Sequence, residues 1–284
     1  MNRTLSIFAA ALALANAAPA SAACLSDVEA AAMVANYMAR KPAANPEGLS
    51  AADGECSRTK VNRFLEQQLG KPVGFKAGLT NPAVQKRFNH NSPVWGKLYA
   101  PMLLKNGATV DAAFGARPLF EADMLVRVSD AGINKARKPA DVLKHIDQVI
   151  PFIELPDLMV DAPGKLNGAA INAINVGARL GVLGTPIAVQ RTQAFSDALR
   201  DFTAIVKGGG TELDRGKGRD VMDHPLNAVV WLAQDMAREG RAMKKGDLIS
   251  LGSFSKLLPP KPGLAVEVTY QGLPGDPTVS VSFK

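Results

Sequence analysis

The stretch LFEADMLVRV at residues 119–128 decides how this sequence is interpreted, together with VIPFIEL at residues 149–155. Both segments are short and rich in Val, Ile, Leu, Met and Phe, which is typical of strands. Because successive side chains of a strand alternate between its faces, we expect Glu121 and Asp123 to point the same way. Glu154 in the second segment would complete an all-oxygen cluster of formal charge −3. Such a cluster needs a positive partner, and oxygen-only ligands favour Mg²⁺, Mn²⁺ or Ca²⁺ over Zn²⁺.

A simpler interpretation of residues 119–128 is a half-buried strand without a metal. The charged side chains would then face water, as they do in most strands with this alternation. The core-facing set would be Phe120, Ala122, Met124, Val126 and Val128, and the water-facing set Glu121, Asp123, Leu125 and Arg127.

The first 22 residues have the features of a secretory signal peptide. Arg3 provides a positive start, residues 5–17 are apolar, and Ala20-Ser21-Ala22 is a small-x-small cleavage site. We therefore expect a periplasmic or secreted protein, cleaved after Ala22. Cys24 raises the alternative of a lipoprotein, but Ser21 stands where a lipoprotein signal normally carries a large aliphatic residue.

Size and charge limit the classes of function. Removal of the signal peptide takes away Arg3 and lowers the formal net charge from +7 to +6. About 260 residues remain, enough for one large domain. No later apolar run is long enough to be a membrane span. The positive charge favours small anionic ligands, whereas scattered Lys and Arg with few aromatics argue against nucleic-acid binding.

The remaining chain has two cysteines, Cys24 and Cys56. In an oxidising compartment we expect them to form a structural disulfide. Neither has a histidine neighbour that would make it a catalytic thiol. The histidines His90, His145 and His224 show no ligand spacing, and His224 is interpreted as a capping or packing residue.

The order of elements predicts an α+β fold with a strongly curved, mixed β-sheet. Residues 23–92 form a helical N-terminal part, with helices over 26–40 and 50–70, a strand over 73–79 and a short helix at Pro82. Residues 93–284 form a β-rich domain that shares one fold with it. Strands are expected at 95–99, 119–128, 149–155, 175–183, 202–207, 212–213, 248–251, 264–270 and 278–283. Between them, Asp223 is expected to cap a helix over 226–238.

Several motifs, read in order, resemble one family. They are GFKAGLT (74–80), FEAD (120–123), PFIEL (151–155), HPLNAVVWLA (224–233) and the segment 244–262. Together they are similar to the 2-keto-4-pentenoate hydratase and 4-oxalocrotonate decarboxylase branch of the fumarylacetoacetate hydrolase superfamily, over residues 49–284. The resemblance implies a mixed β-roll domain that binds Mg²⁺ or Mn²⁺. Members of the family often form homo-oligomers.

The resemblance also assigns residues to the site. It implies that Glu121, Asp123 and Glu154 are the metal ligands, with Asp123 standing where family members usually have Glu. Lys76 is the position that the family uses beside the metal. Next to a divalent ion and partly buried, its pKa is expected to be lowered, which suits proton transfer. Ser253 is a catalytic or substrate contact, and Asn167 a substrate contact.

The implied activity is that of a lyase acting on a small anionic keto acid, a 2-oxo or 2-hydroxydienoic acid, through a metal-stabilised enolate. Two departures bear on which reaction occurs. Val94 and Leu166 stand where hydratases typically carry Asp, and both losses weaken a water-adding mechanism. Hydratase, decarboxylase and enol–keto tautomerase therefore stay open. A further alternative is a degenerate homologue that binds a metal and a keto acid without turnover.

Overall fold

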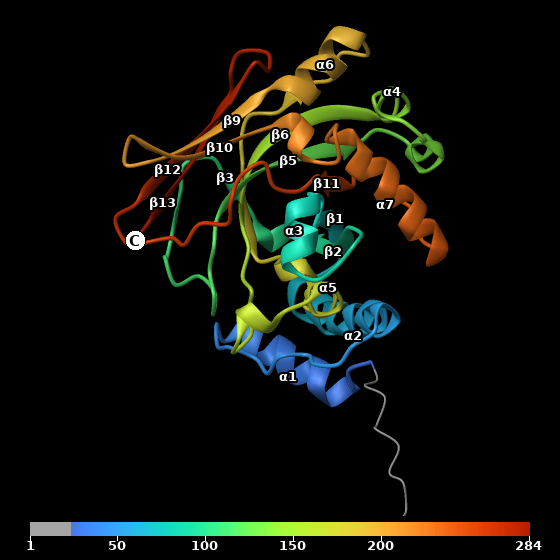
Figure 1. Cartoon of the computed structure of the whole chain (residues 1–284), viewed down its shortest axis with the longest axis vertical. Coiled ribbons are helices and arrows are strands. Elements are labelled where there is room, and N and C mark those ends of the chain that lie inside the picture. The colour runs from blue at the N-terminus through green and yellow to red at the C-terminus, as the bar shows by residue number, and fades with distance from the viewer. Residues whose placement is uncertain (1–23) are drawn as a thin grey trace, which may run out of the picture.

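The computed structural model describes residues 24–284, so the predicted signal peptide lies outside the described residues. The fold is α+β, as predicted, and is built on two curved sheets (Figure 1). The larger sheet has the strand order β2-β1-β11-β5-β6-β7-β3, with β8 paired to β6. Its strands are β1 (Pro72–Gly78), β2 (Val94–Tyr99), β3 (Leu103–Lys105), β5 (Glu121–Val128), β6 (Ile146–Leu155), β7 (Leu180–Leu183), β8 (Ile187–Ala188) and β11 (Leu248–Ser250).

The second sheet has five strands in the order β10-β9-β12-β13-β4. They are β4 (Ala108–Val110), β9 (Thr203–Gly208), β10 (Thr211–Lys217), β12 (Ala265–Gln271) and β13 (Thr278–Phe283). The helices are α1 (Asp27–Met38), α2 (Ala51–Leu69), α3 (Pro82–Arg87), α4 (Pro139–Val142), α5 (Gly168–Ala173), α6 (Gln193–Asp201) and α7 (Leu226–Arg238). α1 and α2 lie at the end of the long axis opposite to α6 (Figure 1).

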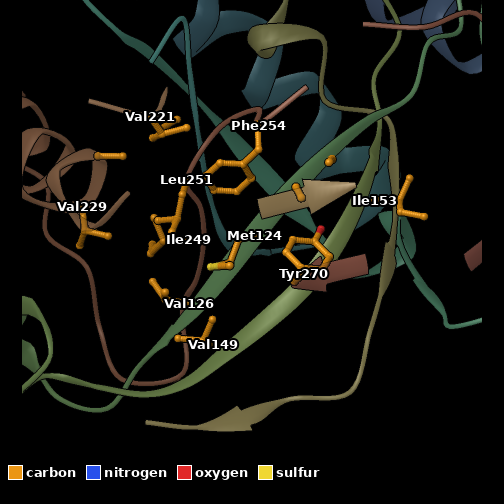
Figure 2. Packing of buried hydrophobic residues seen from close by; sticks show 14 of the residues in the cluster. Met124, Val126, Val149, Ile153, Val221, Val229, Ile249, Leu251, Phe254 and Tyr270 are labelled. Carbon is orange, nitrogen blue, oxygen red and sulfur yellow. The ribbon is translucent and has the colours of Figure 1, made fainter. Parts of the chain in front are cut away.

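Both faces of the central strand β5 are covered. Met124 and Val126 belong to a core shared with the second sheet and α7, whereas Leu125 belongs to a core shared with α1 and α2. Figure 2 shows Met124 and Val126 beside Ile249 of β11 and Tyr270 of β12. The interpretation of β5 as a half-exposed strand is therefore wrong, because helices that are distant in sequence cover its second face. Of the predicted water-facing set, Arg127 alone is not buried.

The two N-terminal helices begin as predicted. The side chains of Ser26 and Ser50 each close a capping box, with Glu29 and Asp53 respectively. The predicted disulfide between Cys24 and Cys56 is present, and it fastens the residues before α1 to α2. A sulfur held in this bond is not available for lipid attachment, so the structure favours the disulfide over the lipoprotein alternative.

Two predicted elements are corrected by the structure. Asp223 does not cap α7: it has a positive φ of 64°, and the ring Nδ1 of His224 accepts a hydrogen bond from the Leu226 N–H instead. The strand predicted over 175–183 begins at Leu180, because residues 175–177 form a short 3-10 turn with left-handed backbone. The capping interpretation of His224 is confirmed.

Within residues 24–284, none of the helices combines the length and the apolar character that crossing a bilayer requires.

Candidate metal and substrate site

Strands β5 and β6 bring the three predicted carboxylates to one face of the larger sheet. Glu121 and Glu154 are direct partners across the antiparallel β5–β6 ladder, and Asp123 follows Glu121 on the same face. All three are buried, with exposed fractions of 8% for Glu121, 0% for Asp123 and 2% for Glu154. The predicted shared face is therefore found.

Asp123 is held by several hydrogen bonds from the chain around β11. Its Oδ2 accepts from the Ser250 hydroxyl at 2.6 Å, and its Oδ1 accepts from the backbone N–H of Gly252 at 3.0 Å. The peptide oxygen of Asp123 accepts from the Tyr270 hydroxyl at 2.5 Å. Tyr270, which Figure 2 shows beside Met124, belongs to β12 of the second sheet, so the second sheet holds the backbone of Asp123 while the chain around β11 holds its carboxylate.

Lys76 reaches the same face from β1. Its ammonium group forms an ion pair with Glu154 Oε1 and donates to the backbone oxygen of Val176 at 2.9 Å. The side chain is 4% exposed. Because an ammonium group has three N–H donors, one donor remains after these two contacts.

Burial and like charge raise the pKa of all three carboxyl groups. Burial raises the pKa of Asp123 to about 7, and the charge of Glu154 adds to this effect. Burial also raises the pKa of Glu154 to about 7, with Lys76 opposing the shift and Glu121 adding to it. The pKa of Glu121 is raised, first by burial. Crowded carboxylates of this kind are stabilised either by protons or by a cation.

The pKa of Lys76 differs in direction from the expectation. Burial acts to lower it, but the charges of Glu154, Glu121 and Asp123 raise the pKa overall. The expected lowering relied on the charge of a divalent ion, which would act against these carboxylates. The protein's own groups therefore favour the charged form of Lys76.

The residues fit a hard divalent cation by two observations. Every donor of the set is a carboxylate oxygen, the ligand type that Mg²⁺, Mn²⁺ and Ca²⁺ prefer. Glu154 Oε2 is buried and has no hydrogen-bond partner. Among the described residues, no other buried side-chain oxygen or nitrogen lacks one. A buried carboxylate oxygen without a hydrogen-bond donor, beside a second carboxylate, is a position that a bound cation would satisfy.

A second carboxylate cluster lies elsewhere. It consists of Glu55, Asp235 and Glu239, each of which places a carboxylate oxygen within 4.8 Å of the others. In the described part of the chain, the predicted trio is not this close together. Arginines already neutralise this cluster, since Arg58 pairs with Glu239 and Arg238 contacts Asp235 at 2.5 Å and Glu55 at 3.1 Å. We assign it a structural role. The predicted trio is less compact because Asp123 bonds to the chain around β11 and Glu154 to Lys76.

A cavity of about 420 Å³ opens onto the face that carries Lys76 and Glu121. Lys76, Glu121, Val176 and Ser253 line it. Asp123 and Glu154 are not among its lining residues, so they lie behind Glu121 and Lys76. The volume suits a small organic acid.

The structure separates the two predicted substrate contacts. Ser253 lines the cavity, and its hydroxyl donates to the Ser255 carbonyl at 2.7 Å. Asn167 does not line the cavity: its side chain accepts from the Ala170 N–H at 2.9 Å and caps α5. The amide oxygen is used as a helix cap, and the assignment of Asn167 as a substrate contact stays a prediction.

Sequence reasoning missed several residues that shape the site. Ser250 and Tyr270 hold Asp123, and the backbone of Val176 holds Lys76. Of these, Ser250 carried a usable signal, since it is a polar residue within an apolar strand. The Val176 contact comes from a carbonyl group, which every residue has, so no side-chain pattern indicates it.

The chain resembles enzymes of known name. It is 31% identical to 2-keto-4-pentenoate hydratase 1 of Dechloromonas aromatica over 204 residues, which cover 71% of this chain and 74% of that enzyme. The chain belongs to the 2-keto-4-pentenoate hydratase and 4-oxalocrotonate decarboxylase family. The resemblance drawn from the motifs is thereby confirmed.

Other relatives of the hydratase and decarboxylase family agree with this assignment. The 4-oxalocrotonate decarboxylase of Pseudomonas putida is 27% identical over 223 residues, 78% of this chain and 82% of that enzyme. The solved structure of 4-oxalocrotonate decarboxylase from Pseudomonas putida G7, complexed with magnesium and adipate, has a TM-score of 0.79 at 24% identity. It covers 92% of this chain and 100% of that one. The fold is also that of fumarylacetoacetate hydrolase family proteins. No family model matches the chain.

Proposed function

We propose that this protein is a divalent-metal-dependent lyase that acts on a small 2-oxo or 2-hydroxydienoic acid. The observation that carries the proposal is the contact between Lys76 and Glu154, directly behind a cavity that Lys76 and Glu121 line. A proton donor, clustered carboxylates and a cavity of suitable size thus meet at one place. The named relatives are hydratases and decarboxylases, and a metal and a dicarboxylate occur together in one neighbouring structure.

Glu121, Asp123 and Glu154 would hold Mg²⁺ or Mn²⁺. A bound divalent ion supplies positive charge that stabilises the negative charge developing on the substrate during the reaction. Lys76 is placed to move a proton to or from the substrate, since it lines the cavity and keeps one N–H beyond its contacts with Glu154 and Val176. Ser253 offers a hydroxyl in the cavity wall for orienting the acid.

The lining residues favour decarboxylation or tautomerisation over addition of water. Val94 and Leu166, which stand at the positions of the missing acids, are buried in the apolar core and do not line the cavity. Two lining acids are already engaged, because Asp214 pairs with Lys256 and Asp220 accepts from the Lys217 N–H at 2.6 Å. Decarboxylation and tautomerisation need a metal and a proton shuttle such as Lys76, whereas hydration also needs a group that positions and activates water.

One lining cation supports a substrate with two anionic groups. Lys76, Arg215 and Lys256 are ion-paired with Glu154, Glu212 and Asp214. In the described part of the chain, Arg87 lines the cavity and forms no ion pair. Because Arg87 is exposed whereas Lys76 is buried, the two cations mark the outer and the inner ends of the cavity.

The test is to incubate the purified protein with Mg²⁺ or Mn²⁺ and either 2-hydroxypenta-2,4-dienoate or 4-oxalocrotonate, and to follow the ultraviolet absorbance and the release of carbon dioxide. We expect metal-dependent carbon dioxide release from the dicarboxylate. Consumption of the dienoate alone would indicate a hydratase if the product has gained water, and a tautomerase if the product is the isomeric 2-oxo acid. Saturable binding of both acids without turnover would identify the non-catalytic homologue and reject the proposal.

We also propose that the protein is exported. The apolar N-terminal segment and the disulfide between Cys24 and Cys56 support export, since disulfides persist in oxidising compartments. Fractionation of cells that express the full chain tests this, and the expected product begins after Ala22. Recovery of the intact chain from the reduced cytoplasm would contradict it.

A further inference from the structure

Three consecutive residues beside the cavity have left-handed backbone. The φ angles of Asn175, Val176 and Gly177 are 54°, 55° and 64°. Glycine adopts this conformation readily, but a β-branched residue such as valine does so only when its surroundings hold it there. The run therefore needs a specific holder.

The side chain of Asn175 is that holder. Its Oδ1 accepts from the Lys97 N–H at 2.7 Å, and its Nδ2 donates to the Lys97 carbonyl at 3.0 Å, so the amide bonds to both backbone groups of one residue of β2. Oδ1 also accepts from Asn62 Nδ2 of α2 at 2.9 Å. Asn175 is 2% exposed and Asn62 is 1% exposed, so these bonds form away from water.

Two glycines make room for the run. A Cβ atom at Gly96 would lie 2.6 Å from the Asn175 carbonyl oxygen and 2.7 Å from its Oδ1. A Cβ atom at Gly78 would lie 2.3 Å from Val176 Cγ1. Strands β1 and β2 thus lack side chains where Asn175 and Val176 press against them.

The middle residue of the run, Val176, contacts Lys76. The Val176 carbonyl accepts from Lys76 Nζ at 2.9 Å, while Glu154 takes a second N–H. These two bonds restrict the ammonium group to one orientation and leave its third N–H available to a ligand in the cavity that Lys76 and Val176 both line. We propose that Asn175 is a positioning residue: it holds the left-handed backbone that aims the Val176 carbonyl at Lys76.

The inference concerns Lys76 in the proposed lyase, and its kinetic consequence therefore rests on the proposed function. The position of the ammonium group does not, so two measurements keep the two ideas apart. The first is the ¹⁵N spectrum of the lysine ammonium groups, in which Lys76→Met identifies the signal of Lys76. The second is steady-state kinetics, with kcat and KM determined separately.

We expect Asn175→Ala to accelerate hydrogen exchange of the Lys76 ammonium group at least ten-fold. It should lower kcat at least ten-fold and change KM less than three-fold, because the lining side chains stay in place. Asn45→Ala is the matched control. Its amide also bonds to both backbone groups of one residue, Ala162, at 2.8 Å and 2.9 Å, but Asn45 has no hydrogen bond to residues 175–177 and does not line the cavity. It should leave both quantities unchanged even where it lowers the melting temperature.

A second substitution tests the backbone explanation. Glycine at position 176 adopts a positive φ without steric cost. The fall in kcat caused by Asn175→Ala should therefore be at least three-fold smaller in a Val176→Gly background than in the wild type. The increase in the exchange rate of the Lys76 ammonium group should be smaller as well.

The proposal would be overturned if the Lys76 ammonium group exchanged its hydrogens at the same rate in Asn175→Ala as in the wild type. Equal effects of Asn175→Ala in the two backgrounds would overturn it as well. Faster exchange in a protein that turns over none of the acids would support the positioning role and reject the lyase assignment.

Discussion

Glu121 and Glu154 lie directly opposite each other across the β5–β6 ladder, both nearly fully buried. Like charges that face each other in this way destabilise a sheet. Here a third carboxylate, Asp123, lies on the same face, and Lys76 is the cation in contact with the cluster. The arrangement is an unfavourable one that a divalent ion would relieve.

We expect added Mg²⁺ or Mn²⁺ to stabilise the EDTA-treated protein. A ligand at 100 times its Kd stabilises the folded state by about 2.7 kcal/mol. Thermal melts with and without the metal measure the effect, and Glu121→Gln should abolish most of it. Glu55→Gln is the matched control because it alters the other carboxylate cluster. If Glu55→Gln abolished the metal effect and Glu121→Gln did not, the metal would be assigned to the cluster of Glu55, Asp235 and Glu239 instead.

The metal-free protein should become less stable as the pH rises. Asp123 and Glu154 each have a folded-state pKa raised to about 7, so folding favours their protonated forms. Their stabilising contribution is fully present below the unfolded-state pKa values, about 4, and is lost as the pH rises through 7. Denaturant midpoints in EDTA between pH 4.5 and pH 8 measure this loss. Glu154→Gln and Asp123→Asn should each flatten the curve, and an unchanged slope in both variants would contradict the assignment.

Lys76→Met should lower kcat sharply. A positioned proton donor contributes roughly 10²–10⁴-fold to the rate, so kcat should fall by about that factor. Lys97→Met is the control, because Lys97 also pairs with a glutamate, Glu66, but does not line the cavity. Equal losses of kcat in the two variants would show that a lysine–glutamate pair matters here for folding alone.

Arg87→Gln should weaken the binding of a dicarboxylate such as adipate and leave a monocarboxylate of the same length unaffected. The expected loss is about three-fold, since an exposed ion pair contributes roughly 0.2–1 kcal/mol. Calorimetry measures both affinities. The neighbouring Lys86, which is exposed and does not line the cavity, provides the control Lys86→Gln. Equal weakening of both ligands by Arg87→Gln would rule out a site for a second carboxylate.

Removal of the disulfide should lower stability without changing kcat. Cys24 and Cys56 are separated by 32 residues. A bond that closes a loop of this length stabilises the folded state by roughly 3–4 kcal/mol in the chain-entropy model. Denaturation of Cys24→Ser/Cys56→Ser measures the change, and a parallel loss of kcat would show that the bond also shapes the cavity.

The sequence predicted the shared face of Glu121, Asp123 and Glu154 because the two-residue period of a strand is a local property. It also predicted the caps at Ser26 and Ser50, which depend on residues three positions apart. These features depend on neighbouring residues in the sequence and not on contacts with distant segments.

Features that depend on distant contacts were not predictable in the same way. The left-handed run at 175–177 is fixed by the Lys97 backbone in β2 and by glycines in β1 and β2. α5 is buried on every side, so its sequence shows no amphipathic period. Asn167 was assigned to substrate because its type suits either a ligand or a helix cap, and the choice depends on where α5 lies.

Strand β11 lies between β1, which carries Lys76, and β5, which carries Glu121 and Asp123. Lys76 is in register with Ser250 of β11, whose hydroxyl also bonds to Asp123. A growing polypeptide that has not reached residue 250 therefore has no strand to join its lysine to its carboxylates. Catalytic competence therefore cannot arise before Ser250 has been synthesised, and a chain that stops short of it would carry all three carboxylates without the strand that organises them.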